Sequence, residues 1–208
     1  MPKHLVVQVI SDPKIAKLLV DSAKRQILRY LAEKELTQKM LAELLGIRDP
    51  SVYYHLKELY AAGLIRVART EPEGHGIIQK FYAANALYFI ADYAKMPLDL
   101  RRYFIAVNLE RLRGVFAILK ALRGITISLS TEEMEKLAEK VAVVLVEVAK
   151  KDEARSSQKV AAAAGREALI MNLYGEALRR VIEDDDDSPG SSGPLRDQLS
   201  ALGFLKLR

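Results

Sequence analysis

The sequence contains no cysteine, and only three of its 208 residues are histidines. Without cysteine the chain forms no disulfide and offers no thiolate as a nucleophile or metal ligand. His4, His55 and His75 are far apart and have none of the spacings at which histidines share a zinc ion. The sequence therefore predicts no metal site and no cofactor.

Long apolar runs are missing as well. The most apolar segment, residues 141–148, is short and contains Glu147, so it falls well below the length that spans a bilayer. The first ten residues lack the apolar stretch and the small-residue cleavage site of a secretory signal. We expect a cytoplasmic protein that does not bind membranes.

The sequence also lacks the residue combinations on which enzymes depend. It shows no nucleophile next to a base, no pair of catalytic carboxylates and no glycine-rich phosphate loop. The acidic pairs Asp12/Asp21 and Glu132/Glu133 are interpreted as helix caps. The net charge of +5 is mildly basic and suits an anionic partner without requiring one. We expect a binding protein that is not an enzyme.

Residues 37–63 contain two short amphipathic helical patterns separated by a tight turn. Thr37 is expected to cap the first helix, and Gly46 to end it in the left-handed conformation that glycine adopts without strain. Asp49-Pro50 is expected to cap the second helix, which Gly63 stops. The apolar residues expected to face the core are Met40, Leu41, Leu44 and Leu45 in the first helix and Val52, Leu56 and Leu59 in the second.

Two further helix starts precede this pair, and a strand pattern follows it. Asp12-Pro13 and Asp21-Ser22 each place a capping residue before apolar residues at helical spacing. Residues 64–70 and 77–83 are β-prone and residues 71–76 are rich in turn formers, which predicts a hairpin. Alternation in the hairpin is imperfect, so the pattern does not assign each side chain to a face.

The second half of the chain predicts helices separated by breaks. Residues 86–95 are expected to start a helix that Met96-Pro97 interrupts. The capping box Ser130–Glu133 opens a later helix, while Gly165 and Gly175 weaken the last one. Residues 184–194 have the composition of a linker and include four adjacent aspartates. The long helices are expected over about residues 99–122, 131–151 and 154–183.

Two short helices followed by a hairpin form the layout of a winged helix-turn-helix. The second helix of such a unit enters the major groove, where arginine can bond guanine, lysine can meet phosphate and a tyrosine ring can contact a thymine methyl. The first helix can hold a phosphate on its free backbone N–H groups, and the hairpin can lie along the adjacent backbone or minor groove. The residues expected to contact DNA are Arg48, Ser51, Tyr53, Tyr54 and Lys57 at the second helix, Thr37, Gln38 and Lys39 at the first, and Arg66, Arg69 and Lys80 on the hairpin.

Four segments together resemble the ArsR-type winged-helix repressors, in particular archaeal members with an added helical C-terminal region. They are Leu19–Leu31, Leu36–Ile47, Ser51–Leu59 and Ala62–Ile65. The resemblance covers about residues 14–85 and implies a homodimer that binds a pseudo-palindromic operator in double-stranded DNA. It also implies that the residues named above at the second helix read the DNA. Metal-sensing members need cysteine or clustered histidine, so the resemblance implies neither metal control nor thiol redox control here.

We expect three regions along the chain: a winged helix-turn-helix DNA-binding domain over residues 1–98, a helical domain over 99–183, and an acidic linker and tail over 184–208. The helical domain is expected to dimerise and so to hold two recognition helices about 34 Å apart, which is one turn of DNA. Aromatic residues between Tyr88 and Phe116 are interpreted as core or dimer seam, with a pocket for a small-molecule effector as the alternative.

The sequence therefore predicts a mainly α-helical protein with a small β-hairpin wing that regulates transcription as a sequence-specific, dimeric DNA-binding protein. Repression by blocking polymerase is the expected mode, with activation left open. Residues 36–84 hold six Lys/Arg against five Asp/Glu, which is a weak electrostatic footprint for DNA binding. Two alternatives therefore stand beside this one: a winged-helix adaptor that docks on a protein of the transcription machinery, and an RNA-binding factor.

Overall fold

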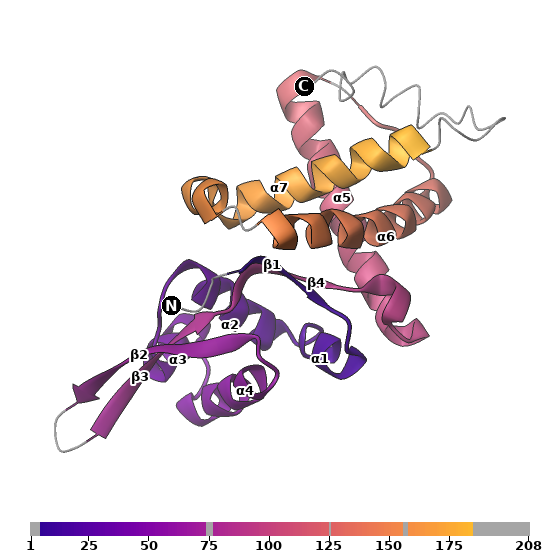
Figure 1. Cartoon of the computed structure of the whole chain (residues 1–208). Helices are drawn as coiled ribbons and strands as arrows, with labels where there is room; N and C mark the ends of the chain where they lie inside the picture. The colour runs from indigo at the N-terminus through magenta and orange to yellow at the C-terminus, as the bar shows by residue number, and fades with distance from the viewer. Residues whose placement is uncertain (1–4, 74–76, 125, 156–157, 185–208) are drawn as a thin grey trace. The chain divides into compact units, whose positions relative to one another are not determined.

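A computed structural model describes residues 5–73, 77–124, 126–155 and 158–184, and the chain divides into two units (Figure 1). The first unit runs to Ala91 and also contains Asp152–Arg166; the second contains Asp92–Lys151 and the chain from Glu167 onward. The protein is mainly helical and has a small antiparallel hairpin directly after the helix-turn-helix region, which confirms the predicted fold class. The predicted linker at residues 184–208 lies outside the described residues, apart from Asp184.

Four helices and four strands open the chain. They are β1 (Leu5–Ile10), α1 (Pro13–Leu18), α2 (Ser22–Glu33), α3 (Gln38–Leu45), α4 (Asp49–Ala61), β2 (Ile65–Glu73), β3 (Ile77–Ala84) and β4 (Ala86–Ala91). Side chains cap the first three helices as predicted, because Asp12 accepts a hydrogen bond from the Lys14 amide at 2.8 Å and Thr37 accepts one from the Met40 amide at 3.3 Å. Asp21 caps α2 in the same way.

The turn between α3 and α4 has the left-handed glycine that the sequence predicted. Gly46 ends α3 in the left-handed region, with φ 64° and ψ 29°, and its amide and that of Ile47 close the last turn on carbonyls of α3. Gly63 follows α4 with φ 69°, and the Leu64 amide then bonds the Leu59 carbonyl. Gly46 therefore turns the chain between α3 and α4, and Gly63 turns it between α4 and β2.

The predicted cap of α4 is wrong by one residue. Arg48 occupies the N-cap position without a side-chain hydrogen bond, while Asp49 and Pro50 are already helical. The Asp49 carboxylate instead accepts a hydrogen bond from the side-chain amide of Gln38 at 2.5 Å, and this bond joins the starts of α3 and α4. The carboxylate still lies at the positive end of the α4 dipole, so it stabilises the helix from inside the first turn.

The predicted core face of α3 is too wide. Leu41 is fully buried, but Met40 and Leu44 are 43% and 44% exposed. Met40 and Leu44 are one turn apart on a neighbouring side of the helix, so they share an environment that Leu41 does not. An eight-residue helix that packs against α4, α2 and β3 buries one narrow stripe, and the second apolar pair remains at the surface.

The hairpin pairs β2 with β3 in antiparallel register from Ile65↔Ala84 to Glu73↔Ile77. Its register shifts between Val67 and Arg69, and this irregularity is the reason for the imperfect alternation in the sequence. Residues 71–73 of the expected turn belong instead to β2, which continues to Glu73, and residues 74–76 lie outside the described part.

The prediction that residues 86–95 start a helix is wrong. Residues Ala86–Ala91 form β4, which pairs in parallel with β1 through register positions such as Val7↔Tyr88 and Val9↔Ile90, and only a 3-10 turn at Tyr93–Lys95 follows. Val7 and Tyr88 are both buried, so the strand is stabilised by a partner about eighty residues earlier in the chain. Local helical spacing in this segment cannot reveal such a partner.

Three long helices complete the chain: α5 (Leu98–Arg123), α6 (Thr131–Arg155) and α7 (Gln158–Asp184). The predicted capping box and the weak point at Gly165 are confirmed, whereas Gly175 lies within α7 without a break. Gly124 ends α5 at φ 68°, and the Ser130–Glu133 capping box opens α6 with hydrogen bonds in both directions. Gly165 interrupts α7 with non-helical φ and ψ of 76° and 170°. No helix in the described residues has the length and apolarity needed to cross a membrane.

The second unit contains buried polar contacts as well as an apolar core. The Tyr174 hydroxyl on α7 hydrogen bonds to the amide oxygen of Asn108 on α5, and both side chains are buried. Asp92, which is 4% exposed, accepts a hydrogen bond from Lys150 of α6 at 3.2 Å. Buried polar groups are costly without partners, so these pairs favour one arrangement of the three helices within this unit.

In the first unit, Lys24 joins α2 to α4 through an ion pair. Lys24 of α2 is 8% exposed, and its Nζ lies 3.0 Å from a carboxylate oxygen of Asp21 and 3.0 Å from one of Glu58 on α4. Burial opposes the charge on Lys24, but the hydrogen bonds to the two carboxylates outweigh it and raise the pKa of the lysine. The Lys24–Glu58 pair therefore favours one rotation of α4 about its own axis.

Lys24→Met should lower the free energy of unfolding by about 1 kcal/mol, since it removes a nearly buried charge-assisted bridge while Glu58 can turn back to water. Urea unfolding followed by circular dichroism measures the effect. Lys136→Met on α6 is the matched control, because its partner Glu132 is an exposed i−4 neighbour and the pair is open to solvent. Equal losses in the two variants would contradict the role assigned to Lys24.

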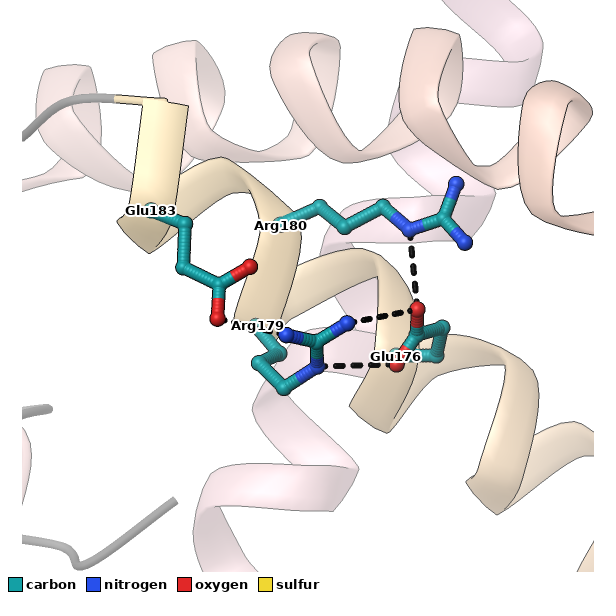
Figure 2. A network of polar contacts seen from close by, with 4 residues as sticks. All are labelled: Glu176, Arg179, Arg180 and Glu183. Atoms are coloured by element: carbon teal, nitrogen blue, oxygen red, sulfur yellow. Dashed lines mark hydrogen bonds and ion pairs between the residues drawn. The ribbon is translucent and has the colours of Figure 1, made fainter. Parts of the chain in front are cut away.

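An ion-pair network on α7 links Glu176 to the guanidinium groups of Arg179 and Arg180 (Figure 2). Arg179 makes two hydrogen bonds of 2.9 Å to the carboxylate, and Arg180 adds one of 2.8 Å. Hydrogen bonds from Arg179, and then from Arg180, lower the pKa of Glu176 to about 2 despite its partial burial.

This shift predicts an acid-dependent loss of stability. The contribution of Glu176 is complete above its ordinary pKa near 4.5 and is lost as the pH falls toward 2, because protonation breaks the ion pairs. Glu176→Gln should therefore be less stable at pH 7, by about 1 kcal/mol for a partly exposed network, and its stability should change less between pH 4.5 and 2. Thermal unfolding at a series of pH values tests this, with Glu135→Gln on the exposed side of α6 as the control.

Candidate nucleic-acid interface

The side of α4 that the sequence predicted to face the core is buried. Val52, Leu56 and Leu59 are 0%, 2% and 0% exposed. At 100° per residue the opposite side of the helix carries the exposed residues Pro50, Tyr54, Lys57 and Ala61. The side that faces away from the core is therefore available to a partner along the whole length of α4 (Figure 1).

A group of tyrosines lies on the side of α4 next to the hairpin. Tyr53 and Tyr60 are 51% and 55% exposed and are two turns apart, so they share this side. Burial, together with the nearby phenols of Tyr53 and Tyr60, raises the pKa of Tyr82 on β3. The ring of Tyr53 also meets that of Tyr54 edge to face, with centroids 5.7 Å apart. The sequence predicted Tyr53 and Tyr54 but missed Tyr60 and Tyr82, although the seven-residue spacing from Tyr53 to Tyr60 was visible.

The other flank of α4 faces α2. It carries Ser51 and His55, which are half-buried, and Glu58, which is bound to Lys24. The bridge from Lys24 to Glu58 has no local sequence signal, because the two residues are more than thirty positions apart. Glu58 is therefore a structural residue, and its negative charge is balanced at the edge of the outward side.

Four predicted contact residues are exposed cations: Lys39 on α3, Arg48 at the start of α4, Lys57 on α4 and Lys80 on β3. In the part of the chain that the structure describes, none of the four forms an ion pair with an acidic side chain. The described residues thus leave their charge without a neutralising carboxylate. Such cations attract the phosphates of a nucleic acid and release its counterions on binding.

Two predicted contacts on the hairpin are already engaged within the protein. The Arg66 guanidinium donates to the Ala84 carbonyl at 2.6 Å, at the base of the hairpin. Arg69 binds Glu35 at 2.8 Å, pairs with Glu71 and lies over the ring of Phe81. These arginines hold the hairpin to itself and to the segment before α3, so Lys80 is the hairpin cation with no such partner among the described residues.

The remaining predicted contacts lie at the start of α3. The Thr37 side chain is buried, and its hydroxyl is used to cap the helix. Gln38 is half-buried and donates to Asp49, so it connects α3 with α4. Of this group, only Lys39 presents a side chain to solvent without another role. No group of three or more His, Asp or Glu residues in the described ranges is arranged to hold a metal ion.

Comparison with known proteins places this region in a family. Residues 21–67 match the family described as "Bacterial regulatory protein, arsR family". The HTH-type transcriptional regulator KmtR of Mycobacterium tuberculosis is 37% identical to the chain over 62 residues. That alignment covers 30% of this chain and 48% of KmtR, so the chain spans about half the length of this curated relative.

The matched residues contain the helices of the candidate interface but only the start of the hairpin. They begin at Asp21, the cap of α2, and run through α3 and α4 into the first residues of β2. The match ends before β3, and it does not reach the second unit. Residues 21–67 are thus a helix-turn-helix domain of the arsR family.

Proposed function

We propose that the protein is a DNA-binding transcriptional regulator whose recognition helix is α4. The observation that carries the proposal is the outward side of this helix, which is solvent-exposed from Pro50 to Ala61 while the opposite side is locked into the core. The family of residues 21–67 supports it, since the family description is that of a regulatory protein. In this arrangement α3 braces α4, and the hairpin lies beside it as a wing.

Each exposed cation has a place in this mode of binding. Arg48 precedes the first turn of α4, where a side chain reaches base edges and can bond two acceptors of guanine. Lys57 lies one turn beyond Tyr54 on the outward side, while Lys39 is on α3 and Lys80 is on β3 of the hairpin. Lysines at these places contact phosphates and fix the register of the protein on the duplex.

The protein acts, in this proposal, as a homodimer on a pseudo-palindromic site, and α5 is the seam between the two copies. One flank of α5, beside its buried stripe, carries the half-buried Tyr103 and Val107 and the exposed Gly114 and Ile118. A Cβ added at Gly114 would meet no atom within 4 Å, so nothing within the described chain requires a glycine there. Glycine inside a helix costs about 1 kcal/mol relative to alanine, and close approach of a second helix would offset that cost.

The expected consequence for a target gene is repression, because a dimer seated on an operator excludes polymerase from overlapping DNA. Docking on a protein is the second candidate, and one observation favours it. Met40 and Leu44 leave apolar surface on α3. An adaptor would show no DNA binding, whereas a regulator binds duplex DNA with sequence preference and a steep dependence on salt.

Arg48→Ala and Lys57→Ala should each weaken binding to the DNA upstream of the protein's own gene while leaving the fold intact. Loss of the phosphate contact of Lys57 should lower the slope of log K against log salt by about 1, whereas loss of the guanine contact of Arg48 should relax the preference for the site. Gel shifts at several salt concentrations measure this, and circular dichroism checks the fold. Lys136→Ala on α6 is the control, because it removes one positive charge outside the first unit. If both variants bind as tightly as the wild type at physiological salt, α4 is not the reading helix.

Gly114→Leu should convert the dimer to a monomer, since the larger side chain is tolerated by the single chain but not by a helix packed closely on Gly114. Analytical ultracentrifugation of the full chain gives the mass. Lys120→Leu is the matched control, because Lys120 is exposed on another side of the same helix. A Gly114→Leu variant that sediments as a dimer would exclude α5 as the seam, and a monomeric wild type would exclude the dimer altogether.

A further inference from the structure

The outward side of α4 has few groups with which to read base edges through hydrogen bonds. Residues 49–61 contain no arginine, asparagine or glutamine, so the side chains that bond guanine or adenine in bidentate fashion are missing, apart from Lys57. Cytosine is read by carboxylates, but Asp49 is bound to Gln38 and Glu58 to Lys24. A helix of this composition needs another means of distinguishing base pairs.

Exposed aromatic surface is what α4 offers instead. Tyr54 is 64% exposed, and it lies on the outward side with its neighbours Lys57 and Ala61. Large apolar groups left in water are costly, so a ring held in this position is suited to contact apolar atoms of a partner. The one apolar group that a base pair presents in the major groove of unmodified DNA is the C5-methyl of thymine.

The ring of Tyr54 is positioned before any DNA arrives. The Tyr53 ring meets it edge to face, at 5.7 Å between centroids and 74° between planes. Tyr53 in turn lies on the hairpin side of α4, near the partly buried Tyr82 of β3. A ring that is already ordered loses less conformational entropy on binding than a free one.

We infer that Tyr54 selects thymine in each half-site by contact of its ring with the C5-methyl group, and that Tyr53 is the positioning residue for that ring. The inference rests on the proposed function, in which α4 enters the major groove, and it names the base that the helix reads there. Arg48 and Lys57 add a guanine or phosphate contact on either side, so the half-site contains thymine under the centre of α4.

The test replaces single thymines by deoxyuridine, which differs only by the missing methyl group. Binding sites are first selected from a random duplex pool with the full-length protein, and each thymine of the preferred site is then exchanged in turn. One thymine per half-site should be sensitive, with wild-type binding weakened about fourfold, which corresponds to burial of one methyl-sized group. Thymines outside the half-sites should show no effect.

Variants assign this sensitivity to the ring. Tyr54→Ala should bind the thymine and deoxyuridine sites equally, whereas Tyr54→Phe should keep the fourfold difference because it keeps the ring. Tyr53→Leu should reduce the difference and Tyr53→Phe should restore it. Lys57→Ala is the control, since it should weaken binding to both duplexes alike and leave their ratio unchanged.

The two failures are distinguishable. If the protein selects a duplex but no thymine is sensitive to loss of its methyl, or if the difference survives in Tyr54→Ala, the inference is wrong and the regulator stands. If no duplex is selected at any salt concentration, the proposed function itself fails, and the inference fails with it.

Discussion

The rotation of α4 about its own axis is the constraint on which the rest of the first unit depends. Val52, Leu56 and Leu59 fill the core on one side, and the Lys24–Glu58 bridge holds one flank to α2. Apolar packing sets this rotation, and the ion pair of 3.0 Å between Lys24 and Glu58 adds a contact between α2 and α4 that favours it. Together they decide which side chains of α4 remain outside, and therefore what surface a partner meets.

Much of this unit could be predicted from local sequence signals. Thr37 and Asp21 cap helices, and Gly46 takes a positive φ. Each of these features depends only on residues within about four positions along the chain, so the local sequence reveals it. The buried and exposed sides of α4 were predicted in the same way, since apolar spacing locates the buried stripe and helical geometry then gives the opposite side. The arsR-family match over residues 21–67 covers the part in which these local signals are densest.

Features that depend on distant residues could not be predicted. Residues 86–91 were expected in a helix because their partner strand, β1, is at the other end of the unit. The partners of Arg66 and Arg69 within the protein could not be predicted either, because a sequence shows charge but not the carbonyl of Ala84 or the carboxylate of Glu35 that engages it. Met40 and Leu44 were assigned to the core because an apolar residue at helical spacing does not reveal how wide the neighbouring contact is.

The parallel pairing of β1 with β4 has a consequence for how the domain is made. Leu5 pairs with Ala86, so the first strand has no partner until synthesis has passed the wing and reached β4. A chain leaving the ribosome can form its helical segments early, because they are local, but this sheet closes late. A fragment limited to residues 21–67 would retain the signature of the family yet lack the sheet that joins the two ends of its domain.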